Sequence, residues 1–434
     1  MGALRRCQVT GAFSPRPEPP LLEVAATNSN TENMKNTCKC DEIQVFLKSR
    51  QLENKRRKGW NGKMKEYKLG DLPESSLHIY GRNSGILDPL TLFWTASGVE
   101  VRVKASELWV EVEAGYDIYE PWISILIDHV PISRQMVQKG RYWIPVFRSL
   151  DKETLRTVRI SKDVQPMSDE PGSFLKIHGF RIDGEFYPVE EKKMKIEFVG
   201  DSITSGEGTE GAKRELCWSS MVFGSVNHYA FMTAEALDAD YHIISQSGWG
   251  VLSSWDGNPK CSLPKYYTQV CGLAADGENA AAGAGEAWNF KAWQPDVVVI
   301  NLGTNDESAF SQPSVFYDEN GKLFDQKLDA DGSYEAESAK RLRDAMKDFL
   351  YEVRQCNPAA EIIWAYGMLG TPLKDLIQEM LDEYQRESGD AAVRFVELIP
   401  ATPDTIGSRE HPGARCHRQA AELLIEEIKK IKKI

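Results

Sequence analysis

The sequence predicts an all-β sandwich followed by a three-layer α/β/α domain with a parallel sheet. Short segments in which apolar and polar residues alternate fill positions 75–190. Apolar runs followed by amphipathic stretches repeat over 191–434. Because alternation is typical of antiparallel strands with one buried face, and the second pattern is typical of β-α units, we expect two domains that meet near residue 190.

The alternating pattern is clearest around three valines. Val99, Val101 and Val103 alternate with charged residues, and the same period returns at 108–112 and 123–127. Glycines and prolines mark turns between these segments. Several half-buried strands at such spacing predict an antiparallel sandwich, and we expect a jelly-roll.

The second half of the chain predicts a doubly covered parallel sheet. The runs 297–300 and 362–363 are apolar without alternation, as in strands that helices cover on both faces. Residues 256–293 are expected to form a long loop over the site, and 311–334 a polar insertion. The expected strands are 194–199, 241–246, 297–302, 361–367 and 392–397, and the expected helices include 335–355, 372–388 and 413–433.

Composition limits the classes of partner. The chain has 434 residues, of which 41% are hydrophobic and 27% charged, so it can bury a sizeable core. Its net charge of −12 argues against nucleic acid or an anionic membrane surface, since both favour a basic face. No apolar run approaches the length of a membrane span. We therefore expect neither nucleic acid nor membrane as a partner.

The N-terminal segment and the cysteines give expectations about location. Residues 1–40 are rich in Pro, Asn, Thr and Ser and are predicted to be a disordered leader, within which Met34 could be the natural start. The eight cysteines are scattered, which favours reduced thiols and a cytoplasmic protein. Cys38 and Cys40 lack a second Cys or His pair at zinc-finger spacing, so we expect no metal.

Four short motifs carry the chemistry. Gly200-Asp201-Ser202-Ile203-Thr204 follows an apolar strand, which would place a serine on a turn at the carboxyl edge of the sheet. Further along the chain come Ser247-Gly248, then Gly303-Thr304-Asn305-Asp306, then His411-Pro412. Each motif alone is explained by a turn, a helix cap or a surface loop. Together, at strand ends and in this order, they indicate a catalytic site.

These motifs resemble the four blocks of the SGNH (GDSL-type) hydrolases. The resemblance implies a flavodoxin-like parallel sheet, Ser202 as nucleophile and His411 as base, with no cofactor. It also implies that the backbone N–H groups of Ser202 and Gly248 and the side-chain amide of Asn305 form an oxyanion hole. Such preformed donors stabilise the negative charge that develops on an ester carbonyl. Glu207 and Glu210, just beyond the nucleophile, are interpreted as solvated loop charges.

One position departs from that family. Its last block usually carries an aspartate three residues before the histidine, whereas this chain has Ser408 there. Asp404 and Glu410 are near in sequence but at other offsets. We therefore expect a Ser-His dyad in which a backbone carbonyl or Ser408 holds the imidazole, although the missing aspartate could also mean that activity is lost.

A sandwich before an SGNH domain resembles carbohydrate esterase family 2. This resemblance covers roughly residues 80–434 and implies removal of O-acetyl groups from carbohydrates such as acetylxylan or acetylated mannan fragments. The chain has 11 tryptophans, and an indole ring can stack on a sugar, so Trp249 is expected to bind substrate. Two alternatives stay open: a broad short-chain or lysophospholipid esterase, and a carbohydrate-binding protein with weak or no turnover. A lipid esterase would usually have an apolar lid, which 256–293 does not supply.

Overall fold

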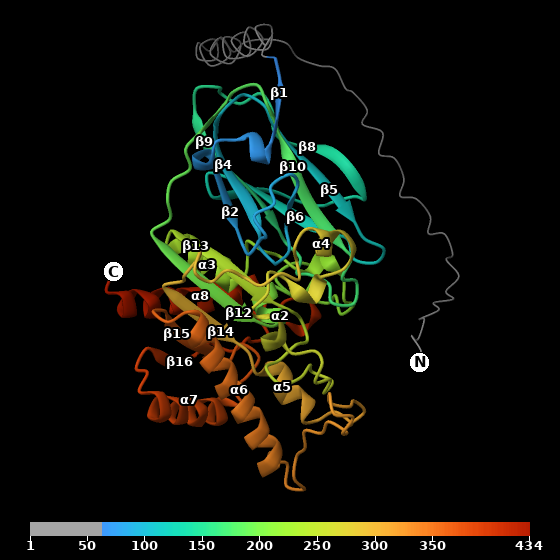
Figure 1. The fold of residues 1–434 in the computed structure, drawn as a ribbon, viewed down its shortest axis with the longest axis vertical. Coiled ribbons are helices and arrows are strands. Elements are labelled where there is room, and N and C mark those ends of the chain that lie inside the picture. Colours follow the sequence, from blue (N-terminus) through green and yellow to red (C-terminus); the bar gives the residue numbers. More distant parts are fainter. Residues whose placement is uncertain (1–62) are drawn as a thin grey trace, which may run out of the picture. The chain divides into compact units, whose positions relative to one another are not determined.

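A computed structural model describes residues 63–434, so the predictions for the 1–40 leader, Met34 and the Cys38/Cys40 pair lie outside the described residues. In the described part an antiparallel sandwich, blue to green in Figure 1, precedes a domain built on a parallel sheet. The fold class is confirmed at this level. No helix within residues 63–434 is long and apolar enough to cross a membrane.

The sandwich consists of two antiparallel sheets, and its strands begin ahead of the expected 75–190 range. The first sheet has, in spatial order, β1 (Lys65–Lys68), β10 (Phe174–Ile182), β5 (Leu108–Gly115) and β8 (Gly140–Phe147), with β3 (Leu90–Thr91) beside β10. The second has β11 (Glu185–Tyr187), β4 (Gly98–Lys104), β9 (Leu155–Lys162), β6 (Trp122–Ile127) and β7 (Val130–Met136), with β2 (Leu77–Tyr80) beside β4.

The alternation in β4 correctly predicts the buried face of the strand but not the face that carries Glu100. Val99, Val101 and Val103 are fully buried between the sheets. Glu100, on the opposite face, is only 2% exposed, because this face of the sheet packs against the second domain rather than facing water. The sandwich is therefore covered on the side where the sequence pattern predicts solvent.

The second domain has one parallel sheet with flanking helices. Its strands lie in the order β13 (Ala239–Ser245), β12 (Met194–Gly200), β14 (Val297–Asn301), β15 (Glu361–Tyr366) and β16 (Val393–Glu397). Its helices are α2 (Ser202–Ser205), α3 (Tyr229–Ala236), α4 (Gly277–Ala281), α5 (Thr304–Ala309), α6 (Ala336–Cys356), α7 (Lys374–Ser388) and α8 (Ala414–Lys432). Its short 3₁₀ turns are η3 (Ser220–Val222), η4 (Leu263–Tyr266), η5 (Gly272–Ala274) and η6 (Ser408–Glu410), while η1 (Leu69–Asp71) and η2 (Glu74–Ser76) belong to the sandwich.

Two helix pairs cover the two faces of the parallel sheet. The buried side chains of α6 and α7 pack with Val298 and Ile300 of β14 on one face. Those of α3 and α8 pack with Val297 and Val299 on the other, and Figure 1 shows the layers. Every residue of β14 is buried, which explains the unbroken apolar run in the sequence.

The strand order places the predicted site. β12 lies between the edge strand β13 and the central strand β14. The chain therefore leaves β12 and β14 toward opposite halves of the sheet, and in such folds ligands bind at the carboxyl ends of the strands at this point. Ser202 follows β12, Gly248 follows β13 and Asn305 follows β14, so three of the four motifs meet at one edge.

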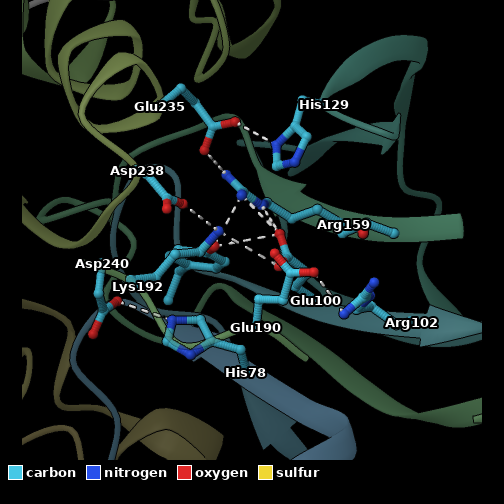
Figure 2. A network of polar contacts seen from close by, with 12 residues as sticks. His78, Glu100, Arg102, His129, Arg159, Glu190, Lys192, Glu235, Asp238 and Asp240 are labelled. Atoms are coloured by element: carbon cyan, nitrogen blue, oxygen red, sulfur yellow. Dashed lines mark hydrogen bonds and ion pairs between the residues drawn. The ribbon is translucent and has the colours of Figure 1, made fainter. Parts of the chain in front are cut away.

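A buried charge network joins the sandwich to the second domain (Figure 2). The Arg159 guanidinium, on β9, lies 2.7 Å from Glu100 and 2.6 Å from Glu235 of α3. It also lies over the ring of Tyr80, 4.1 Å from its centroid. Burial alone would raise the pKa of Glu100, but Arg159 and Lys192 hold it below its ordinary value. The network therefore stays charged and ties strands β4 and β9 of the sandwich to helix α3 of the second domain.

Segment 256–293 differs from the predicted loop over the site. It contains α4, η4 and η5, and it anchors the sandwich. Trp94 Nε1 donates to the carbonyl of Val270 (2.6 Å), and Asn279 Nδ2 donates to that of Ser173 (2.7 Å). These hydrogen bonds satisfy buried backbone groups and attach the segment to the sandwich. Only its first part, up to Leu273, lines the cavity beside Gly248.

Candidate active site

Ser202 sits where β12 turns sharply into α2. The Asp201 carboxylate accepts a hydrogen bond from the Ile203 backbone N–H (3.0 Å) and so caps the short helix. A side chain at position 200 would meet Thr204 Oγ1 at 2.0 Å, so only glycine allows this turn. The Ser202 hydroxyl is thereby held at the carboxyl end of the strand.

His411 reaches this serine from a distant part of the chain. It lies between β16 and α8, and its Nε2 is 3.0 Å from Ser202 Oγ. Its Nδ1 is 2.8 Å from the backbone carbonyl oxygen of Arg409. With Nδ1–H donating to that carbonyl, Nε2 is free to accept the Ser202 proton, which is the arrangement a general base requires.

The loop that carries His411 is closely packed against the loop after the nucleophile. A Cβ at Gly208 would lie 2.5 Å from the Cβ of His411, and the φ of Gly208 is +88°, so glycine is required on both counts. Ser408 Oγ donates to the carbonyl of Glu210 (2.6 Å). Of the two ring partners expected from the sequence, the structure therefore places the backbone carbonyl of Arg409, and not Ser408, at the imidazole.

Gly248 and Asn305 flank the serine from the neighbouring strands. Gly248 has a φ of +79°, which favours glycine, and a Cβ there would lie 3.1 Å from Trp255. Asn305, at the start of α5, is 8% exposed. Its Nδ2 donates to the Trp249 carbonyl at 3.0 Å and to Asp201 at 3.3 Å. All four predicted residues thus converge on one site.

Asp306 organises the loop after Gly248, a role that sequence reasoning missed. Its buried carboxylate accepts hydrogen bonds from the backbone N–H groups of Val251, Leu252 and Ser253 at 2.8 to 3.3 Å. Burial raises the pKa of Asp306, and these hydrogen bonds oppose the shift. A Cβ at Gly250 would lie 2.3 Å from this carboxylate. Asn305 and Asp306 therefore both hold the loop after Gly248.

Asp201 shares this buried environment beside the nucleophile. Burial raises its pKa to about 7, against the hydrogen bond from Ile203, while Asp306 and Glu207 raise it further. A carboxyl group with this pKa is partly protonated at neutral pH. Asp201 is therefore only partly ionised near pH 7.

A cavity of about 680 Å³ adjoins Gly248 and is lined by both domains. Trp249 lines it but is only 7% exposed and packs against Tyr266, with ring centroids 5.5 Å apart. Trp255 is 51% exposed and presents far more ring surface. Tyr119 of the sandwich and Trp218 also line the cavity and contact each other edge to face. The predicted substrate residue Trp249 is at the cavity, with more exposed aromatic rings beside it.

The sandwich also supports the loop before Gly248. Gln165 is 2% exposed and accepts a hydrogen bond from the Ser247 N–H at 2.7 Å. Gln246 Nε2 lies 3.4 Å from Ser168 Oγ. Position 165 carries no motif, so nothing in the sequence indicates this contact. The sandwich is therefore part of the site and not merely attached to it.

The described residues offer no candidate metal centre. Within residues 63–434, no three His, Cys, Asp or Glu side chains are grouped to hold a metal ion. The five cysteines of this part of the chain are free thiols.

Comparisons with known proteins agree with this geometry. Residues 198–419 match the GDSL-like lipase/acylhydrolase family. An acetyl xylan esterase from the rumen bacterium Butyrivibrio proteoclasticus is 39% identical, with a TM-score of 0.84 over 85% of this chain and 99% of the other. A family two carbohydrate esterase from Clostridium thermocellum, solved with cellohexaose, is 27% identical with a TM-score of 0.67 over 82% and 99%.

Part of the chain is also similar in sequence to a curated carbohydrate esterase. It is an acetylxylan esterase / glucomannan deacetylase from Cellvibrio japonicus, 33% identical over 244 residues, which are 54% of this chain and 61% of the relative. The chain spans less than two thirds of the length of the curated relatives it matches. The SGNH and family 2 carbohydrate esterase resemblances read from the sequence are confirmed: the chain belongs to the GDSL-like lipase/acylhydrolase family, in the two-domain form of the family 2 carbohydrate esterases.

Proposed function

We propose that this protein is a serine esterase that removes O-acetyl groups from carbohydrates through a Ser202–His411 dyad. One observation carries the proposal: His411 Nε2 lies 3.0 Å from Ser202 Oγ although 209 residues separate them. A serine and a histidine brought to hydrogen-bonding distance at the carboxyl edge of a parallel sheet form the unit that nucleophilic acyl transfer needs.

In the first half-reaction Ser202 Oγ attacks the acetyl carbonyl carbon while His411 Nε2 accepts the hydroxyl proton. The carbonyl π-electrons move to oxygen and give a tetrahedral oxyanion. When the oxyanion collapses, the bond to the sugar oxygen breaks and His411 returns the proton to that oxygen. The products are a free sugar hydroxyl and an acetylated Ser202.

The developing negative charge would be met by donors from three strand ends. We assign to this role the backbone N–H of Ser202, the backbone N–H of Gly248 and the Asn305 side-chain amide. Of the two Asn305 contacts, the one to Asp201 is the longer at 3.3 Å, so that N–H is the more available to an oxyanion. Donors already fixed by the fold need no reorganisation when charge appears.

The second half-reaction releases acetate. Water attacks the acetyl carbonyl and loses a proton to His411 Nε2, and collapse of the second oxyanion returns that proton to Ser202 Oγ. No net proton or electron is taken up by the protein during the cycle. The Arg409 carbonyl, 2.8 Å from His411 Nδ1, accepts the Nδ1–H, so that Nε2 is the nitrogen that takes up and returns the proton.

The cavity supports a carbohydrate as the group that carries the acetyl ester. Indole and phenol rings can stack on the apolar face of a pyranose while polar groups bind its hydroxyls. Trp255 offers exposed ring surface, Trp218 is half-buried, and Trp249 forms the wall next to Gly248. Gln165 and Asp169 of the sandwich supply polar groups. The similar acetyl xylan esterase and glucomannan deacetylase favour acetylated xylan or mannan oligosaccharides as substrates.

The proposal is tested by acetate release. Wild type and Ser202→Ala are compared on acetylated xylo- and manno-oligosaccharides and on p-nitrophenyl acetate, butyrate and octanoate, with thermal unfolding as the folding control. We expect Ser202→Ala to lower kcat by about three orders of magnitude or more with an unchanged melting temperature. Retention of more than a tenth of the wild-type rate would refute the nucleophile.

The same measurements separate the alternatives. Preference for octanoate over acetate would favour a lipid or lysophospholipid esterase. Binding of the oligosaccharide by wild type without acetate release would favour a carbohydrate-binding protein. Location in the cytoplasm stays a prediction, with the five free thiols of the described chain as its support.

A further inference from the structure

Glu207 is buried beside the catalytic pair, contrary to its interpretation as a solvated loop charge. It follows α2, five residues after Ser202, and is only 2% exposed. Its backbone N–H donates to the carbonyl of Ser202 at 3.0 Å, which ties the two residues into one turn. A carboxylate with so little solvent needs a partner of opposite charge.

The two oxygens of this carboxylate face different groups of the histidine loop. Glu207 Oε1 lies 3.1 Å from Nε of Arg409, and Oε2 lies 3.9 Å from Nε2 of His411. The second distance is too long for a strong hydrogen bond but short enough for a substantial charge interaction. Glu207 therefore lies on the Nε2 side of the imidazole, opposite the side on which SGNH hydrolases carry their aspartate.

Arg409 connects this carboxylate to the other side of the ring. Its guanidinium pairs with Glu207 and donates to the Leu216 carbonyl at 2.7 Å, while its own carbonyl accepts from His411 Nδ1. The φ of Arg409 is +58°, a conformation that non-glycine residues adopt only when contacts compensate for it. The ion pair with Glu207 is one such contact.

We propose that Glu207 is a positioning residue that replaces the absent aspartate, stabilising the protonated His411 ring by its charge and fixing, through Arg409, the carbonyl that orients it. This inference rests on the proposed function of Ser202 and His411. The carboxylate contributes most when Nε2 has taken the serine proton, because only then does the ring carry positive charge. It would therefore affect the rate of acyl transfer more than substrate binding.

The other ionisable groups near the ring are exposed, partly protonated or neutral. On the same loop Glu410 is exposed, with a φ of +57°. On the nucleophile turn Asp201 has its pKa raised to about 7 by burial. On α8 His417 has its pKa lowered to about 3 by burial, so it is neutral at working pH. Glu207 and Arg409 are therefore the charged pair next to His411.

The first test compares Glu207→Gln with Glu410→Gln. Glutamine keeps the shape of the side chain and removes its charge, and Glu410 is the matched control because it adjoins His411 but faces solvent. We expect Glu207→Gln to lower kcat on p-nitrophenyl acetate at least tenfold, with KM within about twofold, and to move the acid limb of the kcat/KM profile to lower pH. Glu410→Gln should stay within about threefold of wild type.

A second variant removes the guanidinium and keeps the backbone. Glycine adopts a φ of +58° without strain, so Arg409→Gly should still present its carbonyl to His411. With the positive charge gone and Glu207 retained, the acid limb should move to higher pH, opposite to Glu207→Gln. A purely structural role would not give shifts of opposite sign. This variant also decides the matter if Glu207→Gln does not fold.

The outcomes separate this inference from the proposed function. If wild type does not hydrolyse esters, or Ser202→Ala retains activity, the proposed function fails. If Ser202→Ala is inactive but folded Glu207→Gln stays within threefold of wild type from pH 5 to 9, only the role of Glu207 is overturned. A lower kcat with an unmoved acid limb in both variants would also overturn it.

Discussion

The backbone carbonyl oxygen of Arg409 lies 2.8 Å from Nδ1 of His411, in the place where a triad would have an aspartate carboxylate. A carbonyl can orient the imidazole because it accepts the Nδ1–H, but it carries no formal charge. The neighbouring acidic residues Asp404 and Glu410 are both exposed. They are therefore poorly placed to take over the role of a buried aspartate.

Neutralising either exposed carboxylate should have little effect. We expect Asp404→Asn and Glu410→Gln, made singly, each to keep at least about a third of wild-type kcat, a change below roughly 1 kcal/mol. His411→Ala should abolish turnover in the same assay. A hundredfold loss in Asp404→Asn or Glu410→Gln, with an unchanged melting temperature, would show that a displaced carboxylate completes a triad.

Removing the Asn305 amide should weaken transition-state stabilisation. Asn305→Ala is expected to lower kcat roughly 10²- to 10³-fold with little change in KM, because the donor is needed mainly when charge develops on oxygen. Since Asn305 also donates to Trp249, cavity shape is checked by the KM for an acetylated oligosaccharide. A raised KM with normal kcat would make Asn305 a substrate-binding residue instead.

The free energy of unfolding should depend on the buried ion pairs of Arg159 at the contact between the domains and little on exposed ion pairs. Arg159→Met removes the cation beside Glu235 and leaves Glu100 with only the more distant Lys192, at 3.8 Å, so we expect the free energy of unfolding to fall by about 3 to 5 kcal/mol. Arg102→Ala is the control variant, and Figure 2 shows Arg102 with its partner Glu190. The Glu190 side chain is 81% exposed, and such surface ion pairs contribute about 0 to 1 kcal/mol to the free energy of unfolding. Urea unfolding of both variants measures the difference, and equal losses would contradict it.

Stability should fall in acid because of a buried neutral histidine. Burial, with a contribution from His411, lowers the pKa of His417 to about 3, and His417 Nδ1 accepts the Tyr229 N–H at 3.1 Å. The unfolded chain then binds this proton more readily than the folded one. The contribution of His417 is therefore present above about pH 6.5 and is lost progressively as the pH falls toward 3.

His417→Asn tests this dependence, because the asparagine carbonyl can still accept the Tyr229 N–H. Between pH 6.5 and 4 the free energy of unfolding of the variant should fall less steeply than that of wild type, by up to about 1.4 kcal/mol per pH unit. Groups that do not interact with His417 titrate equally in both proteins and cancel in the comparison. Parallel curves from urea unfolding at several pH values would contradict the assignment.

The sequence alone determined the fold class and the four motif residues. Alternation in β4 identifies the face that packs inside the sandwich, and the unbroken apolar run in β14 indicates a strand covered on both faces. Both patterns are local. Ser202, Gly248 and Asn305 could be predicted because each follows a strand, and parallel strands end at one edge. His411 could be predicted only through its motif, since it follows the edge strand β16.

Tertiary structure decided what surrounds those residues. Glu207 and Arg409 are 202 residues apart, and Gln165 and Ser247 are 82 apart, so no local pattern links them. The sequence predicts Glu207 to be a solvated loop charge, but the side chain is buried. Burial of a polar side chain depends on which distant segment covers it, and the local sequence does not contain that information. Likewise Glu100 lies on a face that alternation assigns to solvent and that the second domain covers. Periodicity reports that a strand has two faces, but only the packing of distant segments decides what each face meets.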